Sequence, residues 1–114
     1  MKNTIMSFHE STVVHLQYGG SQFLIELEGV IQADSPIRVV LTFRKITNIT
    51  VNGKGITDYD SKHKDGEVIT MQIDQDKKQC QSIIEWNDFK HHTSIVESFK
   101  FDYAKYEIVK IENK

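Results

Sequence analysis

The sequence of 114 residues predicts a single all-β domain, residues 1–114. Three observations predict this fold class. Apolar and polar residues alternate with a period of two in at least five segments. Turn-forming residues separate these segments at short intervals, and no segment has a clear amphipathic helical pattern. We therefore expect an antiparallel β-sandwich or a curled, barrel-like sheet of about seven to eight strands, with at most one or two short helices.

Residues 12–28 predict the first hairpin. A tight turn is expected at Tyr18–Ser21, because the glycine pair within it can supply the positive φ angles of such turns. The alternation predicts two matching apolar faces on the flanking strands. The residues expected on these faces are Phe23, Ile25 and Leu27 on the second strand, and Val14, Leu16 and Tyr18 on the first.

The middle of the chain predicts a loop and then further strands. Residues 29–36 are expected to form the loop, because Ala33-Asp34-Ser35-Pro36 carries turn chemistry. Residues 37–44 and 45–52 read as strands that end at Gly53-Lys54-Gly55, and residues 56–66 read as a surface loop. The expected inward side chains are Ile37, Val39, Leu41 and Phe43, followed by Ile46, Ile49 and Val51.

The second half predicts two more pairs of strands. The expected strands are 67–74, with Ile69, Met71 and Ile73 inward; 79–86, with Cys80, Ser82, Ile84 and Trp86 on one side; 98–103, with Phe99, Phe101 and Tyr103 inward; and 106–112. Turns are expected at 75–78 and 87–88, and residues 89–98 read as irregular. A helix over 94–106 is the competing interpretation, but three aromatic residues at a spacing of two favour a strand.

Composition limits the classes of partner. The net charge is −2, from 14 basic and 16 acidic residues, whereas a nucleic-acid-binding domain is expected to be strongly basic. We expect no direct binding to nucleic acid or to a membrane.

The single cysteine excludes an intramolecular disulfide and suits a reducing compartment. No apolar run has the length of a signal peptide or a membrane span, so a cytoplasmic location is predicted.

The candidates for chemistry have no supporting motif. His9-Glu10 with His91-His92 could form a general acid–base site, and these histidines with His63 could bind a metal. However, the sequence has no HExxH, His-x-His or paired cysteines, and Gly53–Thr57 lacks the full phosphate-loop pattern. Cys80 lies within a predicted strand, so we expect a buried side chain rather than a nucleophile. We predict no enzyme activity, no metal and no cofactor.

An acidic stretch, residues 58–76, is the strongest candidate for a partner-binding site. It holds six acidic residues against two lysines, a local balance of −4. Such a surface can dock on a basic partner, and complementary charge accelerates association. The alternative is a solvated loop followed by the outer face of a strand. The residues predicted to bind a partner are Asp58, Tyr59, Asp60, Asp65 and Glu67.

The first half of the chain resembles a known family. Phe8-His9-Glu10, the hairpin at 12–27 and the apolar segment at 37–51 are similar to small bacterial immunity proteins of polymorphic toxin systems, including contact-dependent growth inhibition. The resemblance implies a non-enzymatic inhibitor that binds one cognate toxin, often a nuclease, and covers its active site. It implies no site residues, since these families bind through variable surfaces.

Two other functions stay open at this point. A curled antiparallel sheet can enclose a small apolar ligand, and His9 with Glu10 could serve an enzyme. Inward aromatic residues could line a ligand cavity or fill a core. Filling a core is favoured, because a small sheet needs the volume of these side chains to pack its interior. These aromatic residues are Phe23, Phe43, Phe99 and Phe101.

Overall fold

The computed structural model describes residues 6–61 and 65–111, and every regular element in these ranges is a β-strand. The all-β prediction is confirmed. Eight strands have five residues or more, and three have two. The strands are β1 (Met6–Ser7), β2 (Thr12–Gly19), β3 (Gln22–Gln32), β4 (Ser35–Arg44), β5 (Thr47–Val51), β6 (Lys54–Gly55), β7 (Tyr59–Asp60), β8 (Asp65–Asp74), β9 (Gln79–Asp88), β10 (Thr93–Asp102) and β11 (Lys105–Ile111).

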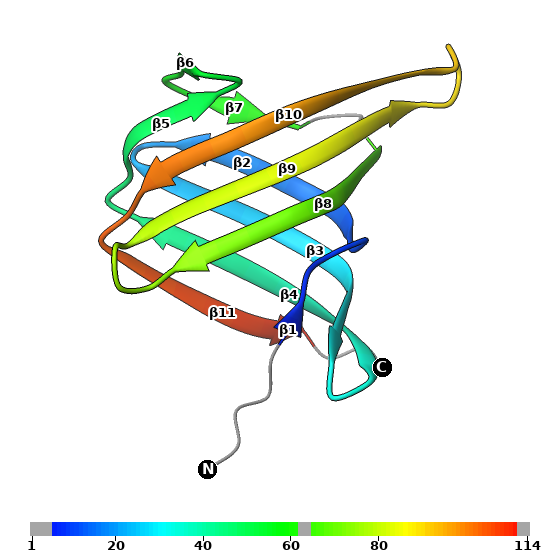
Figure 1. Cartoon of the computed structure of the whole chain (residues 1–114), viewed down its shortest axis with the longest axis horizontal. Coiled ribbons are helices and arrows are strands. Elements are labelled where there is room, and N and C mark those ends of the chain that lie inside the picture. The colour runs from blue at the N-terminus through cyan, green and yellow to red at the C-terminus, as the bar shows by residue number, and fades with distance from the viewer. Residues whose placement is uncertain (1–5, 62–64, 112–114) are drawn as a thin grey trace.

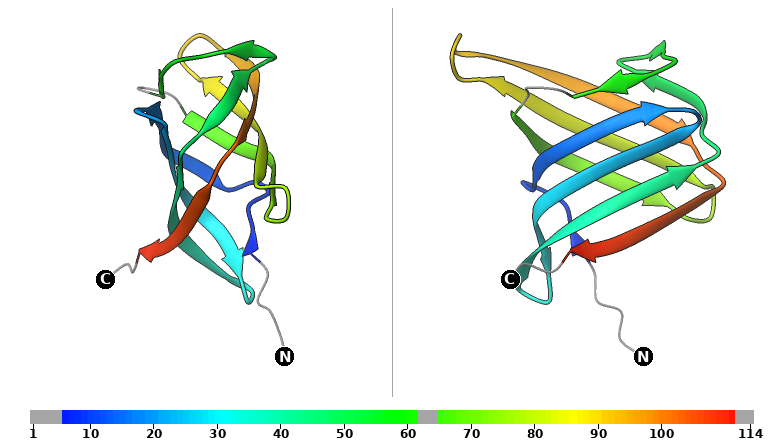
Figure 2. Two further views of the ribbon diagram at one scale, coloured as in Figure 1. Left: turned by 90° about the vertical axis from the view of Figure 1, so that its left-hand side faces the viewer. Right: turned by 180° about the vertical axis from the view of Figure 1, so that it is seen from behind.

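The strands form one antiparallel sheet that curls over itself. Its order is β11-β4-β3-β2-β8-β9-β10-β5-β6, with β1 on β3 and β7 on β2. Figure 1 shows β8, β9 and β10 crossing in front of β2, β3, β4 and β11, and Figure 2 shows the two layers from the side. Strands β2 and β8 pair only through Thr12–Glu67 and Val13–Gly66. This short contact is the corner at which one layer turns into the other.

The core lies between the two layers and is rich in aromatic side chains. Phe23 on β3 and Phe43 on β4 meet Phe101 on β10, with ring centroids 4.6 and 5.1 Å apart. Phe99 joins the cluster with its ring centroid 6.0 Å from that of Phe23. All four side chains are almost completely buried. The aromatic residues therefore pack against one another, as expected of core residues.

The first hairpin forms where the sequence predicts it, but the predicted loop at 29–36 is wrong. Strand β3 continues to Gln32, and the two residues Ala33 and Asp34 turn the chain directly into β4 with φ angles of 52° and 64°. The pairing of β3 with β4 shifts register between Glu28 and Val30. Gly29 sits in this β-bulge with a φ of 76°, and the extra residue returns Val30 to the core.

Two further bulges displace single residues from the predicted faces of β2 and β8, while Leu16 and Tyr18 lie on the predicted face of β2. The register of β2 shifts between Val13 and His15, so Val13 and Leu16 are buried and Val14 is 40% exposed. In β8 the shift falls between Val68 and Thr70. Val68 is therefore buried, whereas Ile69, predicted to be in the core, is only half-buried. The other two predicted core residues of this strand, Met71 and Ile73, are partly buried against the core.

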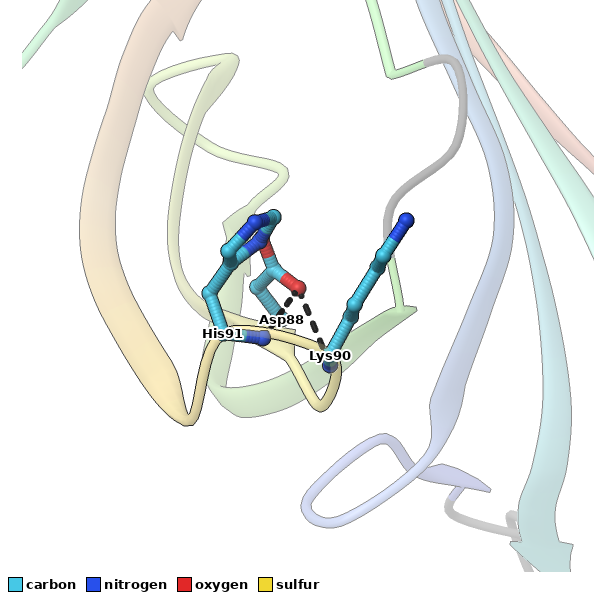
Figure 3. A network of polar contacts seen from close by, with 3 residues as sticks. All are labelled: Asp88, Lys90 and His91. Carbon is cyan, nitrogen blue, oxygen red and sulfur yellow. Dashed lines mark hydrogen bonds and ion pairs between the residues drawn. The ribbon is translucent and has the colours of Figure 1, made fainter.

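The predictions for residues 87–98 are also wrong. Strand β9 runs to Asp88 and β10 begins at Thr93, so the turn is at 89–92 and no irregular segment follows. The competing helix over 94–106 does not form. Strands β9 and β10 pair over ten residues without a shift and project beyond their neighbours (Figure 1). The carboxylate of Asp88 holds the turn, because its Oδ1 accepts hydrogen bonds from the N–H groups of Lys90 and His91 (Figure 3).

Candidate partner-binding surface

The five predicted partner-binding residues fall into two groups. Asp58, Tyr59 and Asp60 lie at β7, whereas Asp65 and Glu67 lie at the start of β8. Asp58, Asp60 and Asp65 are exposed, and the other two are half-buried. Lys62 and Lys64, the two lysines of the acidic stretch, lie outside the described residues. The segment predicted as a surface loop thus contributes a short strand that pairs with β2 at Gln17 and Tyr18.

Tyr59 connects the two layers of the sheet. Its hydroxyl donates a hydrogen bond of 2.5 Å to Oε1 of Glu97 on β10, and its ring packs edge-on against Phe99. Burial, followed by the contact with Glu97, raises the pKa of this phenol. The indole N–H of Trp86 donates to the same Glu97 oxygen at 2.8 Å. Tyr59 therefore holds the β7 segment, and with it Asp58 and Asp60, against β10.

Asp65 and Glu67 face an open hollow that we call the acidic hollow. Its volume is about 510 Å³, and Glu10 also lines it. The backbone N–H of Glu10 donates to the carbonyl of Val68 at 2.8 Å, so the lead-in segment is fixed beside β8. Carboxylates from two distant segments thus share one surface. The residues that line the acidic hollow are Glu10, Thr12, Asp65, Gly66, Glu67, Asn87 and Phe89.

A second hollow of about 610 Å³ adjoins the first and shares Asp65, Asn87 and Phe89 with it. Phe89 stands at the tip of the β9–β10 hairpin and is 70% exposed. The nearby Asp88 contacts Nδ1 of His91 through Oδ2 at 2.8 Å, and this hydrogen bond lowers the pKa of the Asp88 carboxyl. The surface around the hairpin tip therefore combines carboxylates with an exposed aromatic ring.

Two of the histidines considered for chemistry, His9 and His91, have polar contacts in the structure. Nδ1 of His9 contacts the carbonyl of Ile69 at 2.7 Å, and its Nε2 lies 3.6 Å from the Glu10 carboxylate in an exposed pair. His91 contacts Asp88, and His63 lies outside the described residues. Within residues 6–61 and 65–111, no group of three or more histidine, cysteine or acidic side chains could hold a metal ion. The carboxylates of the acidic hollow thus do not form a recognisable metal site.

Cys80 is buried on β9, as its position in the pattern predicts. It is 1% exposed, and burial raises the pKa of its thiol from 9.0 to about 12. A thiol that stays protonated and inaccessible is a poor nucleophile. The Cys80 side chain therefore acts as a small buried side chain of the core rather than as a reactive thiol.

The raised pKa of Cys80 predicts a loss of stability at alkaline pH. The unfolded thiol ionises above about pH 9, while the folded thiol stays protonated to about pH 12. The stabilising contribution is thus complete below pH 9 and declines as the pH rises. We expect ionisation of this thiol in the unfolded state to decrease the free energy of unfolding by up to about 1.4 kcal/mol per pH unit between the two pKa values. Urea unfolding of wild type and Cys80→Ala checks this: their difference should shrink above pH 9, and parallel pH profiles would contradict it.

No family model, curated protein or solved structure matches this chain. None of the described residues forms a helix long and apolar enough to cross a membrane.

Proposed function

We propose that this chain is an immunity protein that binds and neutralises a cognate bacterial toxin by covering its active site. The observation that carries the proposal is the acidic hollow, where Glu10, Asp65 and Glu67 lie beside the exposed ring of Phe89. The toxin we propose is a basic nuclease domain. The protein itself acts without catalysis.

The charges suit such a partner. A nuclease presents cationic groups to the phosphates of its substrate, and carboxylates on a folded sheet can occupy the same groups. Asp58 and Asp60 add two exposed carboxylates at β7, and Tyr59 fixes the segment that carries them. Complementary charge of this kind raises association rates and selects against wrong partners. Phe89 offers the large, exposed ring typical of an interface anchor.

The main alternative, binding of a small apolar ligand, has less support. The aromatic residues that would line such a cavity are Phe23, Phe43, Phe99 and Phe101, and they pack against one another in the core. Two hollows of about 610 and 510 Å³ instead lie at the surface around the hairpin tip, and charged residues line them. This arrangement favours a protein partner.

A binding titration tests the proposal. The probe is the C-terminal toxin domain of a large secreted protein, which we expect a gene neighbouring this one to encode, and the variant carries Asp58→Asn, Asp60→Asn and Asp65→Asn. We expect slower association at low salt and a weaker dependence on salt, because these exposed carboxylates attract the basic partner. If one of the three carboxylates is buried against arginine or lysine in the complex, its substitution should also quicken dissociation. The free energy of binding should then weaken by about 2–5 kcal/mol.

The matched control removes the same charge elsewhere. Asp34→Asn, Asp102→Asn and Glu107→Gln alter carboxylates outside residues 58–76, at the β3–β4 turn, on β10 and on β11, and this variant should bind as wild type does. Equal on-rates and affinities for both triple variants would remove the acidic stretch from the interface. A wild-type protein that neither binds the toxin domain nor blocks its nuclease activity would overturn the function itself.

A further inference from the structure

Within residues 6–61 and 65–111, no strand lies beside the outer edge of β10 over its first five residues. Strand β5 pairs with β10 only from Phe99 onward. The pairing of β5 with β10 ends at Ser98. There the N–H of Asn52 donates a hydrogen bond to the Ser98 carbonyl, and the side-chain oxygen of Asn52 accepts one from the Ser98 N–H. Both hydrogen bonds are 2.8 Å long. Among the described residues, none pairs with the outer edge between Thr93 and Glu97. Figure 1 shows this part of the hairpin projecting from the sheet.

Regular pairing with β9 defines which backbone groups point outward. The register from Thr93 to Asp102 has no shift, so the hydrogen-bonding direction alternates along β10. The backbone groups of Ser98 point away from β9, toward Asn52. Those of Ser94 and Val96 therefore point the same way. The edge presents two N–H groups and two carbonyl groups, arranged symmetrically about Ile95.

This edge lacks the usual protection against pairing. Natural edge strands often carry proline, or lysine and other charged residues, and these discourage pairing with a second strand. The long edge strand at the other end of the sheet, β11, carries Lys105, Glu107 and Lys110. Residues 93–96, in contrast, are Thr, Ser, Ile and Val, and the carboxylate of Glu97, at the end of the unpaired stretch, accepts hydrogen bonds from Tyr59 and Trp86. Ile95 is 54% exposed and Val96 is 53% exposed.

We propose that a second copy of this chain pairs with the outer edge of β10 in an antiparallel, twofold arrangement centred on Ile95. Ser94 of each copy then faces Val96 of the other, and the four outward groups of each copy are all used in four hydrogen bonds. The two Ile95 residues form the close, non-hydrogen-bonded pair at the axis, with Cα atoms about 4.5 Å apart. The interface is isologous, the commonest form among homodimers.

The symmetry and the charge of residues 93–96 indicate that the strand that pairs with this edge is the same strand of a second copy. A segment whose free donors and acceptors are symmetric about one residue is complementary to itself. Residues 93–96 carry no charge, so two copies meet without repulsion along this stretch. The hydrogen bond between Ser98 and Asn52 limits the pairing of the two copies at one end, and the turn at 89–92 limits it at the other end. The pairing is short, and we therefore expect a reversible dimer.

Sedimentation of the full chain over a range of concentrations tests the dimer. Wild type should shift reversibly from monomer to dimer as the concentration rises. Ile95→Lys and Ile95→Glu should each stay monomeric, because like charges would meet at the axis. An equimolar mixture of the two should dimerise again, because opposite charges then meet. Val109→Lys is the matched control: it places the same charge on β11, at a side chain that is 50% exposed, and should dimerise as wild type does.

Cysteine cross-linking tests the register. On mild oxidation, Ile95→Cys should form an intermolecular disulfide at least about tenfold faster than Val96→Cys, because two Val96 positions lie diagonally, beyond the ~7 Å limit for Cα atoms. The native Cys80 is buried and should not react. A wild type that is monomeric at millimolar concentration would overturn the dimer and leave the edge to another strand. Equal cross-linking, loss of dimer in Val109→Lys, or no rescue in the mixture would also overturn the proposal.

Discussion

Replacing Leu41 with alanine is expected to lower the free energy of unfolding by about 2–5 kcal/mol. Leu41 is completely buried on β4, with Ile25 of β3 on one side and Ile108 of β11 on the other. Truncation removes contacts with both neighbouring strands and leaves a cavity that a packed core cannot fully close. Urea unfolding measures the effect as a lower midpoint with an unchanged slope.

The matched control lies on β11. Val109→Ala truncates an apolar side chain that is 50% exposed and should change stability by less than about 0.5 kcal/mol. An unchanged urea midpoint for Leu41→Ala would mean that this face of β4 is not the packed face.

Replacing Gly66 with alanine is expected to destabilise the protein by about 1–3 kcal/mol. A Cβ at Gly66 would lie 2.5 Å from Cζ3 of Trp86 and 3.1 Å from Cβ of Val13. The indole ring must move away, and that movement strains its hydrogen bond to Glu97. Trp86 is the only tryptophan. Its fluorescence should therefore shift in the folded state, while urea unfolding reports the loss of stability.

Gly55 provides the control for the glycine substitution. A Cβ there would meet only the carbonyl of Ile49, at 3.9 Å, which is an ordinary contact. Gly55→Ala should therefore leave the tryptophan spectrum unchanged. If Gly66→Ala also leaves both the spectrum and the urea midpoint unchanged, the close packing of Trp86 on the β2–β8 corner is contradicted.

The sequence predicts those strands in which the alternation is continuous. Phe23, Ile25 and Leu27 on β3, and Val39 and Leu41 on β4, are buried as the period of two requires. The same rule correctly places Phe99, Phe101 and Tyr103 inward on β10 and just after it. Regular pairing of β3 with β4 from Gln22 to Glu28, and of β10 with β9, keeps successive side chains on opposite faces, so the local pattern is sufficient there.

The errors arise where pairing inserts a residue. A bulge shifts the alternation by one position, so Val14 and Ile69 leave the face predicted for them. Nothing local distinguishes these residues from their apolar neighbours. The bulge at Gly29 has a local signal, a glycine inside an apolar run, but the proline that follows favours a loop. Pro36 is in fact tolerated near the start of β4, where it lies opposite Ile31.

The candidate site shows the same limit at longer range. The local excess of carboxylates identifies Asp65 and Glu67, but Glu10 joins them only because β2 pairs with β8 at the corner of the sheet. Residues 89–98 hold too few alternating apolar residues to predict the projecting hairpin. Its exposed side chains, including Phe89, carry no pattern because no second layer covers them.

The order of strands in the sheet has a kinetic consequence. Strands β2, β3 and β4 follow one another in sequence and in the sheet, and so do β8, β9 and β10. Each meander can form through local contacts, whereas the corner between β2 and β8, the pairing of β5 with β10 and that of β4 with β11 all join distant segments. Loop closure must precede these contacts, so contact order is high and folding belongs to the slow range, milliseconds to seconds. Docking of two preformed meanders is the natural rate-limiting event.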